Sequence, residues 1–416
     1  MVSCFLFYNT LGKIIPIGVK QLELFTDEPK TLISLEDVFA AYYECRKHKR
    51  RTMNAMEFEI NLEENLIQLW QDLNNETYQV GRSVAFIVKH PVFREVFAAN
   101  FRDRVVHHLV VRKLWTLINA SFSPHSYSCR PGMGTLYGVK KVYEQMQSCS
   151  HNFTNNYFVL RLDIQAFFMH IQHNKLYQML NQLIQNKYHA PDKGIILRLL
   201  KKIIFTPVQY NCIIKGEKND WKTLPISKSL FHIGHRKGLP IGNLTSQIFA
   251  NFYLNTLDYF IADYHGIFYS RYVDDLVLLH TNKKILLSCK EKIISILDTL
   301  GLKLHAHKTH LLHGSQGFNF VGVFLLPGRI YAGRRLKTFF FQKIYALQKN
   351  KKLSHIISVV NSYLGLLYHY NSYHLRLKAI SLIEKNFPGV MASENARKVF
   401  IIQHSLQHLR AFSRYN

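Results

Sequence analysis

Three aspartates lie in parts of the sequence that are otherwise apolar enough to form buried strands. Asp163 lies in the run YFVLRLDIQAFF, and Asp274 and Asp275 lie together in IFYSRYVDDLVLLH. An unpaired carboxylate is costly to bury, so three carboxylates in such runs predict a shared cation. Hard divalent ions such as Mg²⁺ take carboxylate oxygens and keep positions open for phosphate, and two of them can clamp a phosphoryl transfer. The alternative is that Asp274 and Asp275 only form a tight turn, which Asp does well.

The segments around these aspartates show strand and helix patterns that would position them. Apolar, β-branched and aromatic residues predict a buried strand over 157–168 and a hairpin over 267–280 with the acidic pair at its tip. We expect an extended region over 84–99 and further strands around 302–305 and 318–325. The apolar spacing predicts helices that begin after the capping box at 34–37 and cover 61–73, 101–115, 176–184, part of 238–260 and 284–300. The stretch 206–237 is irregular and basic, and the chain beyond 327 is predicted to be helical.

The charge balance indicates a polyanionic partner. The chain has 53 Lys and Arg against 27 Asp and Glu, a formal net charge of +26, and 48% of its 416 residues are hydrophobic. That composition excludes a disordered basic tail and favours nucleic acid over a membrane surface as partner. The six cysteines form no C-x-x-C pair, which argues against a zinc ribbon and a disulfide framework. With no cleavable leader and no apolar stretch long enough to span a bilayer, we expect a cytoplasmic protein that makes no membrane contact.

The order of several motifs resembles the palm of a reverse transcriptase. Over about residues 84–325 the chain carries, in succession, LDIQAFF, GLPIGNLTSQ, RYVDDLV, LKLHAHKT and FNFVGV. Upstream, FRDRVVHH and SYSCRPGMGT resemble the finger motifs, and NSYLGLLYHYNSY at 361–373 resembles the thumb. The likeness extends to the enzymes of bacterial diversity-generating retroelements and to the related enzymes of antiphage defence systems.

The resemblance implies roles for individual residues. Asp163, Asp274 and Asp275 fall on the catalytic, metal-binding triad, which would hold two Mg²⁺ ions, with Mn²⁺ as a substitute. Phe168 falls on the steric gate that excludes a ribose 2′-hydroxyl, so the product would be DNA; without the motif, an aromatic after a core strand is ordinary packing. Lys308 matches a lysine near the triphosphate, where it would assist the departure of pyrophosphate.

The loop before the second catalytic motif departs from the common family pattern. Many reverse transcriptases have L-P-Q-G followed by S-P, whereas here Ile241 replaces the Gln before Gly242, and Gln247 replaces the Pro. The departure resembles the error-prone retroelement enzymes. Loss of an amide at Ile241 would remove a polar contact to the incoming nucleotide or template, so we predict reduced discrimination between bases.

Arginines upstream of the palm are candidates for phosphate binding. Guanidinium groups bind phosphate in a forked geometry, and the resemblance favours Arg130, with Gly132 and Gly134 allowing close backbone approach. The finger segment also contains Arg94, Arg102 and Arg104, for which a solvated helix surface is an equal alternative.

Two clusters of ring side chains have competing interpretations. His305, His307, His310 and His313 invite a zinc interpretation, but no cysteine lies nearby and only His305 and His307 would share a strand face, so a nucleic-acid-facing surface is preferred. In the predicted thumb, aromatic and basic residues interleave as in a surface that follows a duplex, or else they pack a helical core. They are Tyr363, Tyr368, Tyr370, Tyr373, Arg376 and Lys378.

We therefore predict an α+β fold of the right-hand polymerase type, with fingers, a palm built on an antiparallel sheet and a helical thumb. The predicted divisions are 1–80 (N-terminal extension and helices), 81–327 (fingers and palm) and 328–416 (thumb and RNA-binding region). The predicted function is RNA-directed DNA polymerase, which makes cDNA from a non-coding or template RNA and deoxynucleoside triphosphates. The alternative is a catalytically idle RNA-binding protein of polymerase descent.

The biological role has two candidates at this point. One is mutagenic copying in a diversity-generating retroelement with a small accessory protein. The other is antiphage defence, with a dedicated RNA and in some systems a second polymerase. The extension at 1–33 favours defence, and its own function is open, as are the primer and the oligomeric state.

Overall fold

The computed structural model describes residues 32–47, 52–89, 92–217, 219–348, 352–393 and 395–401. Most of the 1–33 extension and residues 402–416 lie outside these ranges, so what the sequence predicts for them stays a prediction. Among the described helices, none is both long and apolar enough to cross a bilayer.

Runs of helices and runs of strands follow one another along the described chain. The helices up to residue 205 are α1 (Leu35–Arg46), α2 (Met53–Ile60), α3 (Leu62–Asn74), α4 (Phe101–Ser121), α5 (Thr135–Cys149), α6 (Phe167–His170), α7 (His173–Lys187) and α8 (Lys193–Phe205). The later helices are α9 (Asn219–Lys222), α10 (Leu244–Tyr253), α11 (Asn255–Ala262), α12 (Lys283–Thr299), α13 (Arg334–Leu347), α14 (Leu353–Leu367) and α15 (Tyr373–Asn386). The strands are β1 (Ser83–Val88), β2 (Arg94–Ala98), β3 (Phe158–Asp163), β4 (Cys212–Ile214), β5 (Phe268–Tyr272), β6 (Asp275–His280), β7 (His310–His313), β8 (Phe318–Phe320), β9 (Val323–Leu326), β10 (Arg329–Ala332), β11 (Val390–Ala392) and β12 (Val399–Ile401).

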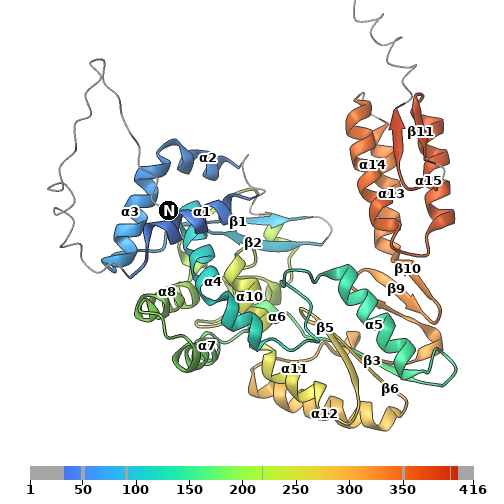
Figure 1. Ribbon diagram of the computed structural model, residues 1–416, viewed down its shortest axis with the longest axis horizontal. Coiled ribbons are helices and arrows are strands. Elements are labelled where there is room, and N and C mark those ends of the chain that lie inside the picture. The colour runs from blue at the N-terminus through green and yellow to red at the C-terminus, as the bar shows by residue number, and fades with distance from the viewer. Residues whose placement is uncertain are drawn as a thin grey trace, which may run out of the picture.

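A four-stranded antiparallel sheet in the order β5-β6-β3-β7 lies in the lower part of Figure 1. Its two central strands, β3 and β6, are mostly apolar and mostly buried on both faces, whereas β7 at the edge is partly exposed. Leu160 and Leu278 belong to the large core that also contains residues of α11 and α12, whereas Val159 and Val277 belong to a second core shared with α5, β8 and β9. The predicted α+β class with an antiparallel sheet is confirmed.

Two further units flank this sheet. A three-stranded sheet in the order β2-β1-β4 has β1 and β2 antiparallel and β1 and β4 parallel. At the upper right of Figure 1, α13, α14 and α15 pack with β11 and β12 around a core of their own that begins at Ala332. The helices α1, α2 and α3 share the large core with α4, α7 and α8. The division at residues 80 and 327 stays a prediction.

Local chemistry explains several elements that the sequence predicts. Ser34 caps α1, because its hydroxyl accepts a hydrogen bond from the Asp37 backbone N–H at 3.1 Å. The hairpin at 267–280, the helices over 61–73 and 284–300 and the helix that starts at residue 101 are also confirmed.

Four predicted elements were wrong in extent or type. The single strand predicted around 318–325 is an antiparallel hairpin of β8 and β9, because Val321 and Gly322 take positive φ values and turn the chain between them. The strand predicted over 157–168 ends at Asp163, because Ala166 takes a positive φ of 44° and starts the helical turn α6. The predicted strand at 302–305 is a single bridge between Leu304 and Ile164, and the fourth strand of the sheet is β7 instead. The region beyond 327 is not all helical, since β10, β11 and β12 lie within it.

Candidate active site

The register of the central sheet brings the predicted aspartates to one end of it. Asp163, the last residue of β3, is the direct antiparallel partner of Asp275, the first residue of β6. Opposed residues of such a pair have Cα atoms about 4.5–5.5 Å apart. Asp274 lies in the turn before β6, and its carbonyl accepts a hydrogen bond from the Ile164 N–H at 3.3 Å. Asp163 and the adjacent pair Asp274 and Asp275, more than 110 residues apart in sequence, therefore meet at one end of the sheet.

The electrostatics of this end of the sheet are unfavourable to three ionised carboxylates. Burial, together with the charges of Asp275 and Asp163, raises the pKa of Asp274 to about 6. Burial and the charge of Asp163 also raise the pKa of Asp275. Arg161 lies two residues before Asp163 on β3, and its charge opposes the rise at Asp275. The donor set is hard oxygen with excess negative charge, which fits a hard divalent cation.

Lys308 holds one of the three carboxylates. Its Nζ lies 3.0 Å and 2.9 Å from the two Asp163 carboxylate oxygens, with the lysine side chain 55% exposed and the aspartate 14%. Lys308 ends a short 3₁₀ turn (Ala306–Lys308), and the His305 N–H donates to the Asp163 carbonyl at 2.7 Å. With Asp163 paired in this way, no group of three His, Cys, Asp or Glu side chains in the described residues is already gathered as a metal site.

The buried side chain of Arg271 holds the turn that carries Asp274. The sequence motifs did not predict this role. Its side chain and that of Asp258 are both 0% exposed and form an ion pair. The Arg271 Nε lies 2.6 Å from an Asp258 carboxylate oxygen, and its Nη1 donates to the Val273 carbonyl at 2.9 Å. Val273 has a positive φ of 58°, which is rare for a β-branched residue, so this bond holds a strained turn. An arginine in an apolar strand was as unusual a feature as the aspartates.

The predicted gate and the predicted nucleotide loop are joined by backbone hydrogen bonds. Phe168 lies on α6, half-buried, and its carbonyl accepts from the Leu239 N–H at 2.8 Å. Further along the loop, the Ile241 carbonyl accepts from the Phe97 N–H of β2 at 2.9 Å. Gly242 has a φ of 123°, and a Cβ there would meet Val96 Cγ1 at 2.8 Å. Only glycine fits this close approach of the loop to β2.

The predicted phosphate arginines are mostly engaged within the protein. Arg130 donates from Nη1 to the Ser123 and Ser126 carbonyls, both at 2.9 Å, so its guanidinium holds the 123–130 turn. Gln247 is exposed on α10 with its Oε1 3.7 Å from the Cys129 sulfur, which brings this loop against the helix. A phosphate-binding role for Arg130 and the substrate role of Gln247 stay predictions.

Of the three other predicted phosphate arginines, two are bound within the protein and one is exposed. Arg102 forms an ion pair with Asp72, and Arg104 Nε donates to the Ala99 carbonyl at 2.8 Å. Arg94 is exposed at the start of β2.

The two ring clusters are also placed. His305 precedes the 3₁₀ turn and His307 lies in it, with ring centroids 6.2 Å apart, while His310 and His313 belong to β7. In the C-terminal unit, Tyr363 and Tyr370 pack against its core, whereas Tyr368 and Tyr373 are exposed. Lys378 is exposed and Arg376 is buried, where it donates to the carbonyls of the 395–396 turn. The buried Arg376 guanidinium lies 5.4 Å from the ring centroid of Tyr368 and 5.8 Å from that of Tyr373, so it supports the two exposed rings from the interior.

Comparison with known proteins gives a family match for this chain. The family model "Reverse transcriptase (RNA-dependent DNA polymerase)" matches residues 89–325, more than half of the chain. The COX1/OXI3 intron 2 protein of Saccharomyces cerevisiae is 25% identical over 261 residues, which are 61% of this chain and 26% of that protein. The retron Ec86 reverse transcriptase of Escherichia coli is 23% identical over 253 residues, 59% of this chain and 67% of that protein.

Among solved structures, apo telomerase from Candida tropicalis is similar with a TM-score of 0.46 and 14% identity, covering 74% of this chain and 60% of that one. A likeness at this TM-score adds nothing to the assignment. The chain spans about a quarter of the length of the yeast relative and two thirds of the retron relative.

Proposed function

The chain belongs to the reverse transcriptase family, and from this premise we propose that it is an RNA-directed DNA polymerase that copies a template RNA into cDNA. The observation that carries the proposal is the pairing of Asp163 with Asp275 beside the Asp274 turn. In a family that polymerises nucleotides, three carboxylates at one end of a strand can supply the oxygen ligands for the divalent ions that nucleotidyl transfer uses.

We propose Asp163, Asp274 and Asp275 as the carboxylates that hold two Mg²⁺ ions, for which Mn²⁺ can substitute. When bound, such ions neutralise charge on the reacting phosphate and orient the attacking and leaving oxygens. Lys308, beside Asp163 and largely exposed, interacts with the triphosphate and supplies positive charge or a proton to the departing pyrophosphate.

The other proposed roles concern which nucleotide is accepted. Phe168 excludes the ribose 2′-hydroxyl, because α6 holds it five residues after Asp163 and its carbonyl is tied to the 239–242 loop. Ile241 and Gly242 in that loop, with Gln247 and Arg130 next to it, form the remainder of the proposed substrate site. An apolar side chain at Ile241 offers no hydrogen bond to a base, so we expect reduced fidelity.

Primer extension tests the proposal directly. Purified protein is given an annealed RNA template and DNA primer with deoxynucleoside triphosphates and Mg²⁺, and RNA affinity is measured in parallel. Asp274→Asn should lower extension by at least about a hundredfold, since even groups that only hydrogen-bond a metal ligand are worth about 10- to 100-fold. Asp298→Asn, an exposed aspartate on α12, is the matched control and should leave extension unchanged.

The outcomes separate the two functional hypotheses. Extension that is lost in Asp274→Asn with RNA affinity retained supports the polymerase. Unchanged synthesis by Asp274→Asn refutes the site assignment. RNA binding without extension by the wild type identifies the catalytically idle RNA-binding protein instead.

The proposed partners are a dedicated non-coding or template RNA, its cDNA and an accessory protein or second polymerase. Sequencing of nucleic acid that co-purifies from the native operon distinguishes the roles. Complementary DNA with substitutions at template adenines indicates a diversity-generating retroelement. Simple or repetitive DNA with no target-gene match indicates defence.

A further inference from the structure

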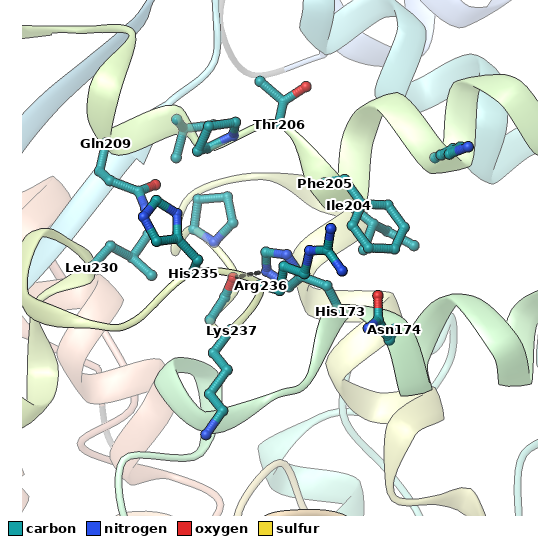
Figure 2. Close-up of a pocket in the computed structure, with 15 residues that line it drawn as sticks. His173, Asn174, Ile204, Phe205, Thr206, Gln209, Leu230, His235, Arg236 and Lys237 are labelled. Atoms are coloured by element: carbon teal, nitrogen blue, oxygen red, sulfur yellow. Dashed lines mark hydrogen bonds between the residues drawn. The ribbon is translucent and has the colours of Figure 1, made fainter.

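A basic pocket of about 740 Å³, shown in Figure 2, is lined by none of the three candidate catalytic aspartates. Its walls come from three segments that are distant in sequence: the start of α7, the end of α8 with residues 206–209, and residues 230–240. We call it the basic pocket, after Lys201, His235, Arg236 and Lys237, which line it together with the ring of Phe205. A volume of this size is typical of pockets that hold a small ligand or one nucleotide.

The charge of the basic pocket is uncompensated. None of its lining residues is Asp or Glu. Lys201, Arg236 and Lys237 are exposed, and within the described part of the chain none of them has a carboxylate at ion-pair distance. Cations gathered in a concave site without counter-charges attract phosphate, and Arg binds it through a planar fork.

The wall that carries Arg236 is held in place by backbone pairing. The His173 N–H donates to the Arg236 carbonyl at 3.0 Å, and the His173 Nε2–H donates to the Gly238 carbonyl at 2.7 Å. The Gly238 N–H donates to the Ile171 carbonyl at 2.9 Å. Arg236 itself has a positive φ of 64°, a conformation that costs a non-glycine residue energy. The fold therefore keeps a guanidinium at this position in spite of backbone strain.

A buried carboxylate anchors the start of the same 230–240 segment. Glu95 on β2 is 1% exposed and accepts hydrogen bonds from Trp221 Nε1 at 2.8 Å and Ser229 Oγ at 2.7 Å. It also accepts from the N–H of Leu230, a pocket residue, at 2.6 Å. This carboxylate fixes the 219–232 segment, which is made of α9 and short 3₁₀ turns, against β2, so the segment that enters the basic pocket is held in place.

Apolar and ring side chains complete the pocket. Phe205 is half-buried, and its ring centroid lies 5.9 Å from that of His173, another pocket residue. The ring of His235 lies 5.8 Å from that of the exposed Tyr210. Rings next to cations are the combination by which proteins hold single-stranded nucleic acid, with bases stacked and phosphates paired.

The basic pocket is also continuous with the catalytic segments. Its residues Gly238 and Pro240 run directly into the Ile241–Gly242 loop, and His173 follows α6, which carries Phe168. The segments that line the basic pocket are therefore the same segments that lead into the candidate active site, and a single-stranded nucleic acid could contact both.

We propose that the basic pocket binds one nucleotide of a single-stranded RNA segment, with its phosphates on Lys201 and Arg236 and its base against Phe205. The choice of RNA rests on the proposed function, whereas the nucleotide chemistry rests on the pocket itself. The bound strand is an unpaired part of the template or partner RNA that continues toward the active site.

Fluorescence anisotropy with a labelled single-stranded RNA of about 12 nucleotides tests the proposal over a series of KCl concentrations. The test variant is Lys201→Gln/Arg236→Gly. Glycine adopts the positive φ at position 236 without strain, so this variant keeps its fold while losing both cations. The matched control is Lys222→Gln/Lys228→Gln, which removes two exposed lysines from the neighbouring 219–232 segment that do not line the pocket.

We expect the test variant to bind RNA at least about tenfold more weakly, because it loses two charge-assisted hydrogen-bonding groups. The slope of log K against log salt should fall by about 1.4, since each phosphate contact to a single strand contributes about 0.7. The control variant should keep its affinity within about twofold. Phe205→Leu should weaken binding by a similar factor without a change in slope, because it removes stacking and no charge.

Equal losses in the test and control variants would show a diffuse electrostatic effect and overturn the proposal. So would an unchanged slope in Lys201→Gln/Arg236→Gly. If the wild type binds adenosine monophosphate saturably, and the test variant loses this binding but keeps its RNA affinity, the ligand of the pocket is a free nucleotide and the RNA proposal is overturned. Primer extension by the same wild-type protein reports the proposed function separately: its absence would refute the polymerase while the anisotropy result still decides the pocket.

Discussion

The buried ion pair between Arg271 and Asp258 should couple the stability of the central sheet to catalysis. Both side chains are inaccessible to solvent, and Tyr269 also donates to Asp258 at 2.7 Å. Asp258→Asn leaves the Arg271 guanidinium buried without a counter-charge, and Arg271→Met leaves the carboxylate in the same condition. Breaking a buried pair from one side costs about 3–5 kcal/mol.

The expected magnitudes follow from that cost. At about 2–4 °C per kcal/mol for a cooperative unit of about 150–250 residues, each single variant should lower Tm by about 6–20 °C. The double variant Asp258→Asn/Arg271→Met buries no unpaired charge, so its loss of unfolding free energy should be about 1–3 kcal/mol smaller than the sum of the single losses.

Activity should follow a different order from stability. Arg271 is a positioning residue, because its Nη1 holds the Val273 carbonyl in the turn that carries Asp274. Arg271→Met and the double variant both lose this bond, and a displacement of about 1 Å at a reacting centre can cost about a hundredfold. We therefore expect single-nucleotide incorporation to fall at least about tenfold in kcat in both, with little change in KM, and to fall less in Asp258→Asn.

Urea unfolding and steady-state single-nucleotide incorporation measure the unfolding free energy and the values of kcat and KM on the same preparations. Losses below about 1 kcal/mol in both single variants would show that the pair is not desolvated as described. Wild-type incorporation by the double variant would refute the positioning role of Arg271, whatever its stability.

Two further predictions concern stability and loop geometry. Burial lowers the pKa of His107 to about 3, below the ordinary 6.5, so the unfolded chain binds the extra proton between these values and stability falls as pH drops below 6.5. Between pH 6.5 and 5 the free energy of unfolding should fall by about 2 kcal/mol. Urea titrations should show that His107→Gln no longer has this pH dependence, whereas the exposed control His189→Gln keeps it. An equal pH dependence in both variants would contradict the assignment to His107. Gly242→Ala should cost about 1–3 kcal/mol and reduce incorporation, because its Cβ meets Val96 at 2.8 Å at a positive φ. Gly365→Ala, in α14 with open space around it, should be neutral or stabilising, and equal thermal unfolding of the two alanine variants would refute the clash.

Local sequence determined which elements form and which residues could do chemistry. The capping box at Ser34, the hairpin around Asp274 and the apolar periodicity of α12 all depend on neighbours within one or two turns. The carboxylate of Asp163 is unusual in its strand because an unpaired charge is costly to place among apolar residues, which the sequence alone shows. The strongly basic composition is likewise a property of the sequence, and it indicates a polyanionic partner without reference to the fold.

Tertiary structure decided which distant groups meet. The pairing of Asp163 with Asp275 and Lys308, the network of Arg271 and the closing of the basic pocket all join segments separated by tens to more than a hundred residues. The end of β3 at Asp163 and the choice of β7 as its partner, in place of the predicted 302–305, were also tertiary outcomes. The same side chains satisfy the local pattern of a strand in either case, and only packing and backbone hydrogen bonding across the sheet distinguish them.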